Sequence, residues 1–274
     1  MDKQTFFERH KRIKKIFATF NKVRIFLLSK VLKRPFFCGS SKDLKHYKNS
    51  FSGKRCFIVC TGPSLTLEDL HLIKDEISFS MNSIVNKFKE TDFRPSFYLI
   101  QDGEVEKRIR NQILACKPNN MFVGLSNAYG IANYVISKKT YKKIYGDCGF
   151  FTVDTLSVVY DLWYNKKKLN FRISQNPIKK VFDGTTITYS ILQLAFFMGF
   201  KTVCLLGADG TIGIHFDDNK DNKNAPTALT QIMAYEKAKQ YAEQHGISIY
   251  NCTRGGKLEV FERKSLEEVL NNNL

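Results

Sequence analysis

From residue 54 onward, short apolar runs alternate with helix-like stretches, and this alternation limits the fold more than any other feature of the sequence. We expect strands at 55–60, 77–82, 96–101, 120–125, 201–206 and 247–251. Helical patterns lie between them at 66–75, 103–115, 154–164, 185–198 and 228–245. Short apolar strands joined by helices form a mostly parallel sheet that is covered on both faces. The sequence therefore predicts a Rossmann-like, doubly wound α/β fold.

The division of the chain follows from the same pattern. At 274 residues the chain is long enough for one large domain with an appendage. We place an N-terminal arm at 1–50 and the α/β domain at 51–274, with a lid or insertion at 126–180, where lysine-rich and aromatic pieces interrupt the pattern. The tail "KSLEEVL" predicts a short capped helix. No apolar run approaches the roughly 18 residues of a membrane span.

The arm carries much of the positive charge. Residues 1–50 hold fourteen Lys or Arg against three Asp or Glu, within a formal net charge of +17 for the whole chain. Apolar side chains recur there about every 3.6 residues with basic residues between them, so we expect a basic amphipathic helix that ends near Pro35. Such a helix lies on anionic lipid, or it packs on its own domain or on a second subunit. We favour the membrane surface.

Several partners and compartments are disfavoured. Basic residues continue through the apolar stretch, unlike a secretory signal, and no nucleic-acid module follows the arm. We therefore expect a cytoplasmic protein that is peripheral on the inner membrane face through residues 1–35, with no nucleic-acid partner and with homo-oligomerisation left open. The seven cysteines are odd in number, and three lie inside expected strands, as in a reducing compartment. Cys56 and Cys60 have no second Cys or His pair nearby, so we expect no zinc site.

The first candidate site is the turn "CTGPSL" after strand 55–60, because open α/β sheets collect ligands at the carboxyl ends of their strands. Gly62 allows close approach, Pro63 fixes its own backbone, and the hydroxyls of Thr61 and Ser64 lie beside a helix start that attracts anions. The turn suits a phosphate or a ribose phosphate. A plain turn with a helix cap is the alternative, since the dinucleotide fingerprint and the Walker lysine are both absent.

Two further strand ends carry polar residues. Asn82 ends the strand in "FSMNSI", and Gln101 and Asp102 follow the strand in "YLIQDGE". Each of them could simply begin a turn. Three consecutive parallel strands that end in polar groups would nevertheless line one crevice, so we include all three residues among the candidate nucleotide contacts.

The segment "DGTTITYSILQLAFFMGFKTVCLLGADG" is the richest in candidate residues. Gly184, Thr185 and Thr186 open a helix, whose N-terminus is a second anion site. The next strand leads to Gly207 and Asp209, which emerge at the same edge of the sheet.

A candidate general base follows in "IHFDD". His215 lies in a loop beyond a strand end, near Asp217 and Asp218, and an imidazole is suited to deprotonate a hydroxyl group. A solvated loop histidine is the alternative. Near the end of the chain, Arg254 follows the last expected strand, where it could meet phosphate oxygens or belong to a sharp turn.

These motifs together resemble a known group. The turn of "GTGPSL" type, the "MN" strand end, the "GTT" helix start, the "LLGAD" strand and the terminal "GISIYNCTRGGKLEVF" resemble bacterial proteins of the domain-of-unknown-function 115 type, also called the 6-hydroxymethylpterin diphosphokinase MptE-like group. The resemblance covers about residues 50–270. That group is in turn similar to the bacterial family 42 sialyltransferases, which use a CMP-linked nonulosonic acid and have one Rossmann-like domain with a lid.

The resemblance implies roles for particular residues. The turn from Thr61 to Ser64 would hold CMP, with Asn82 beside the phosphate or ribose. Thr185 and Thr186 would lie near the donor sugar, and Asp209 matches the aspartate of the family's "GID" motif. Two departures stand out, because the tyrosine after that aspartate is missing and "NKNAPTAL" occupies the position of the family's base histidine. His215 would have to act from the preceding loop.

We therefore expect a glycosyltransferase that transfers an acidic sugar, such as sialic acid, a related nonulosonate or Kdo, from a CMP-activated donor to a surface glycan or lipid-linked acceptor. It would need no cofactor and no metal, although Asp209, Asp217 and Asp218 could bind magnesium. One alternative is a pyrophosphokinase that uses ATP, magnesium and a pterin. The other is a non-catalytic nucleotide-binding component of polysaccharide assembly.

Overall fold

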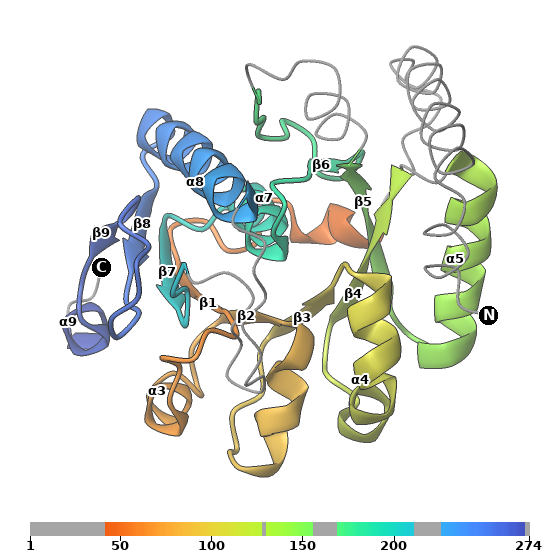
Figure 1. Cartoon of the computed structure of the whole chain (residues 1–274), viewed down its shortest axis with the longest axis horizontal. Coiled ribbons are helices and arrows are strands. Elements are labelled where there is room, and N and C mark those ends of the chain that lie inside the picture. Colours follow the sequence, from red (N-terminus) through yellow and green to blue (C-terminus); the bar gives the residue numbers. More distant parts are fainter. Residues whose placement is uncertain (1–41, 128–129, 156–168, 211–225, 272–274) are drawn as a thin grey trace, which may run out of the picture.

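The fold is a single open sheet with helices on both faces (Figure 1). The computed structural model describes residues 42–127, 130–155, 169–210 and 226–271. Its nine strands are ordered β6-β5-β4-β3-β2-β1-β7-β8-β9, and every neighbouring pair is parallel. The expectation of a Rossmann-like, doubly wound α/β fold is confirmed.

The strands are short, and apart from Arg55 the central ones are buried along their whole length, as expected for parallel strands covered on both faces. Their bounds are β1 Arg55–Val59, β2 Ser78–Met81, β3 Phe97–Ile100, β4 Met121–Ser126, β5 Gly149–Asp154, β6 Val181–Phe182, β7 Thr202–Leu206, β8 Ser248–Asn251 and β9 Glu262–Arg263. All six strands that the sequence predicted are present, within a residue at each end.

The helices divide between the two faces. On one face lie α3 Leu67–Leu72, the 3-10 helix η3 Asn82–Lys89, α4 Gly103–Cys116, α5 Gly130–Tyr145 and α9 Leu266–Asn271. On the other lie the 3-10 helix η2 Lys42–Tyr47, α7 Ile187–Met198 and α8 Pro226–Gln244. Each face has its own apolar core.

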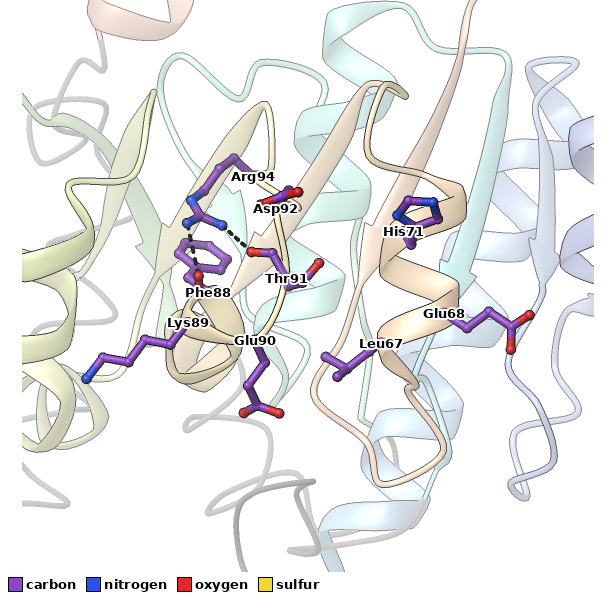
Figure 2. Close-up of a pocket in the computed structure, with 9 residues that line it drawn as sticks. All are labelled: Leu67, Glu68, His71, Phe88, Lys89, Glu90, Thr91, Asp92 and Arg94. Carbon is purple, nitrogen blue, oxygen red and sulfur yellow. Dashed lines mark hydrogen bonds between the residues drawn. The ribbon is translucent and has the colours of Figure 1, made fainter.

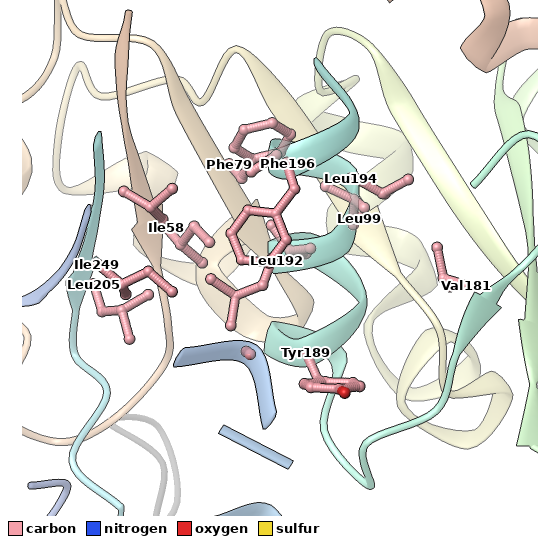
Figure 3. Close-up of a cluster of buried hydrophobic side chains, with 14 of the residues drawn as sticks. Ile58, Phe79, Leu99, Val181, Tyr189, Leu192, Leu194, Phe196, Leu205 and Ile249 are labelled. Atoms are coloured by element: carbon pink, nitrogen blue, oxygen red, sulfur yellow. The ribbon is translucent and has the colours of Figure 1, made fainter. Parts of the chain in front are cut away.

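Helix α7 lies at the centre of one of these cores. Its side chains Leu192 and Phe196 meet Ile58, Phe79 and Leu205 of the sheet (Figure 3). Nearly all of α7 is buried, because the sheet covers one side and α8 packs on another. A helix that is apolar all round is stable only in such a place. Its position and its direction are therefore fixed by packing.

The order of the strands creates a topological switch point. From β1 the chain moves outward in one direction as far as β6, and it then returns to form β7 on the other side of β1. Parallel pairing aligns Val59 with Leu206, so β1 and β7 end at the same level. Connections that diverge from two neighbouring strands leave a crevice at their carboxyl ends, where α/β proteins bind ligands.

The stretch 126–180, where we expected a lid or insertion, differs from the prediction. Residues 130–154 form α5 and β5, and β5 pairs with β4 inside the sheet. The predicted helix at 154–164 falls almost entirely outside the described residues, as does the predicted amphipathic helix of the arm. Within the described ranges, no helix is long and apolar enough to cross a membrane.

Candidate functional site

The ends of β1 and β7 are joined by direct contacts. Gly62 N donates to Gly207 O at 2.9 Å, and Asp209 Oδ2 accepts from Ser64 Oγ at 2.9 Å and from Ser64 N at 3.4 Å. A Cβ atom at position 62 would lie 1.9 Å from Asp209 Oδ2, so only glycine fits there. The close approach that we expected a ligand to make at Gly62 is thus made by the carboxylate of Asp209, which is 6% exposed.

The amide groups of this turn are already used. The N–H groups of Gly62 and Ser64 donate to Gly207 O and to Asp209 Oδ2. Leu65 N donates to Gly62 O at 3.2 Å, and Pro63 has no N–H group. The start of α3 is closed by a capping box between Thr66 and Asp69. The turn therefore offers a ligand the hydroxyl group of Ser64 rather than a row of free amides, while Thr61 is buried.

Two backbone N–H groups at the N-terminus of α7 have no acceptor among the described residues. Thr186 Oγ1 accepts from Thr188 N at 3.4 Å, and Thr185 N donates to Asp183 Oδ1 at 2.8 Å. The N–H groups of Thr186 and Ile187 donate to no described residue. Two free amides at the positive end of a helix of this length attract an anion.

Contacts of Thr188 place this helix end at the carboxyl ends of β1 and β2. Its Oγ1 lies 3.5 Å from Cys60 Sγ, directly after β1, and 3.7 Å from Met81 Sδ, the last residue of β2. The sequence analysis missed Thr188, because a threonine inside an apolar helix gives no signal of its own. Its burial and its two sulfur neighbours fix the α7 N-terminus across the ends of β1 and β2.

Asn82 follows β2 at the same place. Its backbone is left-handed, with φ 47°, and its carbonyl accepts from Tyr98 Oη at 2.7 Å. Its side-chain Oδ1 is buried and has no hydrogen-bond partner within the described part of the chain. An unpaired buried acceptor costs about 1–3 kcal/mol, so a donor group on a ligand would relieve a real deficit here.

The other predicted rim residues have structural partners. Gln101 Oε1 accepts from Ser190 Oγ at 2.8 Å, which ties the end of β3 to α7. Asp102 caps α4, since its Oδ1 accepts from Glu104 N at 2.8 Å and from Val105 N at 3.4 Å. Gln101 therefore lies against α7 at the carboxyl end of β3, and the carboxylate of Asp102 is occupied by its own helix.

Arg254 lies in an ion-pair cluster rather than beside an open space. Its Nε lies 2.8 Å from Asp69 Oδ1, and its Nη2 lies 2.9 Å from Glu267 Oε1. The pKa of Arg254 is raised, first by the hydrogen bond to Asp69 and then by the bond to Glu267. The guanidinium thus connects the loop after β8 to α3 and α9.

A polar cluster that the sequence analysis missed lies farther along the same edge. Lys180 forms an ion pair with Asp154 at the end of β5, and Asn127 Nδ2 donates to Asp154 Oδ1 at 3.1 Å. Burial raises the pKa of Asp183, opposed by the hydrogen bond from Thr185 N. Asp183, the aspartate of the motif "DGTT", could have indicated this polar cluster, but the sequence analysis used only the residues that follow it.

The buried thiol of Cys60 lies directly after β1, against Thr188 of α7. Burial raises the pKa of Cys60 to about 12, and the negative charge of Asp209 acts in the same direction, while the hydrogen bond with Thr188 opposes it. The thiol therefore stays protonated at neutral pH and does not serve as a nucleophile.

The remaining predicted residues cannot be located. His215, Asp217 and Asp218 lie outside the described residues. In the part of the chain that is described, no group of three or more His, Cys, Asp or Glu side chains is placed to hold a metal ion.

A pocket of about 550 Å³ lies away from this edge, between α3 and the segment after η3 (Figure 2). Its charges are mixed, and Arg94 is held by the carbonyl oxygens of Thr91 at 2.9 Å and Phe88 at 3.0 Å. None of the predicted site residues lines it. We interpret it as a surface depression closed by Arg94.

Comparison with known proteins gives a family and a fold. The family model described as "6-hydroxymethylpterin diphosphokinase MptE-like" matches residues 35–215. No curated protein matches the chain. Among solved structures, the Maf glycosyltransferase from Magnetospirillum magneticum AMB-1 is 15% identical with a TM-score of 0.50, over 85% of this chain and 39% of that one. The chain thus spans well under half of that protein.

Two sialyltransferase structures are also similar. CstII from Campylobacter jejuni in complex with cytidine-5'-monophosphate is 17% identical with a TM-score of 0.47, over 81% of this chain and 88% of that one. A CST-II structure with a trisaccharide acceptor and CMP is 16% identical with a TM-score of 0.47, over 81% and 89% of the two chains. At such identities the likeness concerns the fold alone.

Proposed function

This chain belongs to the 6-hydroxymethylpterin diphosphokinase MptE-like family, and from that premise we propose that it binds a nucleotide at the carboxyl ends of β1, β2 and β7 and acts as a glycosyltransferase. The donor that we propose is a CMP-activated acidic sugar, such as sialic acid, a related nonulosonate or Kdo. The acceptor is a glycan or a lipid-linked glycan.

One observation carries the proposal, which is the position of the α7 N-terminus. Thr188 fixes that helix end across the ends of β1 and β2, and the free N–H groups of Thr186 and Ile187 lie there. A phosphate at this point gains from both amides and from the helix dipole. The switch point between β1 and β7 lies immediately beside it.

The neighbouring residues fit the rest of a nucleotide. The unpaired Oδ1 of Asn82 can accept from a ribose hydroxyl or from the amino group of a cytosine. Asp209 can accept from a sugar hydroxyl, as carboxylates at such crevices do.

The proposed reaction is a single displacement. The oxygen of an acceptor hydroxyl bonds to the anomeric carbon of the sugar, the bond from that carbon to the phosphate oxygen breaks, and CMP leaves with the electron pair. The α7 amides stabilise the charge that develops on the leaving phosphate. The hydroxyl proton goes to a general base, for which we propose His215.

Two further points support this choice over other uses of the fold. The sequence motifs resemble the family 42 sialyltransferases, whose donor is a CMP-linked sugar. The fold is also shared with a glycosyltransferase from Magnetospirillum magneticum AMB-1, although this chain spans only 39% of it.

The test is release of CMP from CMP-sialic acid and from CMP-Kdo, measured with acceptor glycans in the presence of EDTA. We expect turnover in EDTA, lost in His215→Ala and reduced at least about tenfold in Asn82→Ala. Asn49→Ala is the matched control, because Asn49 is also left-handed, with φ 57°, but contacts the far end of α7 through Phe197 O. Equal activity of Asn82→Ala and Asn49→Ala would contradict the proposed site.

A second candidate is favoured by the family itself. A pyrophosphokinase would use ATP and magnesium on a pterin, and the carboxylate of Asp209 at the crevice could help to hold a magnesium–nucleotide complex. This candidate requires stabilisation by ATP with magnesium and loss of activity in EDTA. A non-catalytic nucleotide-binding role in polysaccharide assembly would instead leave function intact in His215→Ala.

We also propose that residues 1–35 hold the protein at the inner face of the cytoplasmic membrane. The high density of Lys and Arg among apolar residues in this segment supports binding to anionic lipid. Deleting residues 1–35 should abolish sedimentation with vesicles that contain anionic lipid. Unchanged sedimentation would favour packing of the arm on protein.

A further inference from the structure

A second pocket lies on the face of the sheet that carries α7 and α8. It has a volume of about 610 Å³ and lies between the C-terminal half of α8 and the segment 169–182. That volume is within the usual range of roughly 300–1,000 Å³ for ligand sites. The residues that line it include no Asp or Glu, but they include Arg172, Lys179, Lys180 and Lys237.

Three of these cations are available to a ligand. Lys180 is committed to Asp154, whereas Arg172, Lys179 and Lys237 have no carboxylate partner anywhere in the described ranges. Like charges gathered without counter-ions repel one another, and an anion removes that repulsion. The pocket is therefore complementary to a negatively charged group.

Aromatic rings form one wall of the pocket. His245 stacks on Tyr241 with ring centres 3.9 Å apart, and Tyr241 stacks on Phe196 with centres 5.3 Å apart. Across the pocket, the ring of Phe182 has Lys180 Nζ at 4.8 Å and Arg172 Cζ at 5.9 Å from its centre. Flat apolar rings beside cations suit a ligand with both an apolar face and a negative charge.

The opposite wall is held by a buried side chain. Gln193 of α7 is 1% exposed, and its Oε1 accepts from Ser174 N at 3.1 Å and from Phe182 N at 2.9 Å. Its Nε2 donates to Phe182 O at 2.8 Å, and Tyr189 Oη donates to Arg172 O at 2.9 Å. The backbone that carries the cations is thus fixed to α7.

The same contacts connect the pocket to the proposed nucleotide site. Tyr189 lies one helical turn after Thr186, the N-cap of α7. Lys180 reaches Asp154 at the carboxyl end of β5, on the edge of the sheet where the crevice lies. The segment 172–182 and helix α7 therefore link the pocket to the edge of the sheet that carries the proposed nucleotide site.

We propose that this pocket binds a carboxylate-bearing oligosaccharide, as the subsite for an acceptor chain that already carries acidic sugars. The cations bind the carboxylates, and the ring of His245, which Tyr241 supports from behind, packs against the C–H face of a sugar. The inference rests on the proposed function, since an enzyme that adds acidic sugars to a glycan meets such chains as acceptors and products. It does not depend on which acidic sugar the donor carries.

The test is direct binding to the full-length protein by isothermal titration, without donor. The probes are sialyllactose, with lactose as the neutral control, and CMP as a competitor. We expect sialyllactose to bind at least about tenfold more tightly than lactose, which is ~1.4 kcal/mol. Binding should weaken as salt is raised, because the contacts are charged and partly exposed.

The variant Lys237→Gln removes one cation from the pocket, and Lys239→Gln is its control. Lys239 lies on the same helix, is exposed and does not line the pocket. We expect sialyllactose to bind at least about fivefold more weakly to Lys237→Gln and unchanged to Lys239→Gln. The melting temperatures of both variants should equal that of the unmodified protein, so that loss of binding is not loss of folding.

The outcomes separate this inference from the proposed function. Four results would each overturn the acceptor subsite. Lactose and sialyllactose could bind equally, or neither could bind. The two variants could have equal affinities for sialyllactose, or CMP could displace sialyllactose. A different result would reject the proposed function alone. In that case sialyllactose binds in a way that depends on Lys237, which supports the proposed ligand of the pocket, but CMP does not stabilise the protein.

Discussion

Asp209 is held between Gly62 and Gly256 so closely that neither glycine can carry a side chain. A Cβ atom at position 62 would lie 1.9 Å from Asp209 Oδ2, and one at position 256 would lie 2.7 Å from Asp209 Cα. Gly256 also has φ 77°, which L-residues rarely adopt. Asp209 is thus fixed from both sides at positions where only glycine leaves room, its carboxylate by Gly62 and its backbone by Gly256.

The first prediction concerns Gly62→Ala. The added methyl group must displace the Asp209 carboxylate and meet Gly207 O at 2.3 Å, so we expect a loss of about 1–3 kcal/mol in the free energy of unfolding. Thermal unfolding measures this directly. Gly103→Ala is the control, because its Cβ atom would lie 3.6 Å from Tyr141 Oη, an ordinary contact distance. We expect this variant to be as stable as the unmodified protein or more stable. Similar losses in both variants would contradict the packing.

The second prediction separates two roles of Arg254. In Arg254→Ala the buried carboxylate of Asp69 loses its ionic partner, so we expect a loss of about 1–2 kcal/mol in stability. The affinity for CMP should change less than about twofold, because the guanidinium is engaged by Asp69 and Glu267. Chemical denaturation and nucleotide titration measure the two quantities. A variant of full stability that no longer binds CMP would show that Arg254 contacts phosphate after all.

The third prediction concerns Gln193, which holds the segment 169–182 against α7. Leucine has a similar volume but leaves Ser174 N, Phe182 N and Phe182 O without their partners, so Gln193→Leu should lose about 2–4 kcal/mol. Gln193→Glu keeps an acceptor for both amides but sets a buried carboxylate oxygen against Phe182 O and Tyr189 O, so its loss should shrink as the pH falls and the carboxyl group takes up a proton. Melting temperatures at pH 7 and pH 5 are the measurement, and a leucine variant as stable as the unmodified protein would contradict the account.

The fourth prediction is a pH dependence. The folded protein keeps the proton of Cys60 up to a pKa of about 12, whereas an unfolded thiol loses it near 9.0. Between these values the folded state binds more protons, so stability falls as pH rises, by about 1.4 kcal/mol per pH unit for one thiol. Denaturation from pH 7 to 11 should show a shallower fall in Cys60→Ala. Identical slopes would mean that Cys60 does not titrate as described.

The strands β1 to β4, β7 and β8 could be predicted from the sequence because each is an apolar run bounded by small or polar residues. β5 could not, since Gly149 opens it and the lysine-rich α5 precedes it without a clear apolar stripe. β6 and β9 have two residues each, which is too short for any periodic signal. Their pairing depends on tertiary contacts such as the bonds from Gln193.

The candidate site could be proposed from the sequence only as one edge of the sheet. Polar residues after parallel strands indicated the carboxyl-end edge, where Asn82 Oδ1 has no hydrogen-bond partner among the described residues. The sequence does not show that Asp209 fills the space over Gly62, or that Arg254 is taken by Asp69. Such pairings join residues that are far apart along the chain, and only the folded structure reveals them.

A crystal structure of the full chain with CMP tests the central claim most directly. We predict a phosphate oxygen within hydrogen-bond distance of the N–H groups of Thr186 and Ile187, with the side-chain amide of Asn82 bonded to the nucleotide. CMP bound instead in the pocket between α3 and η3, or anywhere away from the carboxyl ends of β1, β2 and β7, would contradict the account.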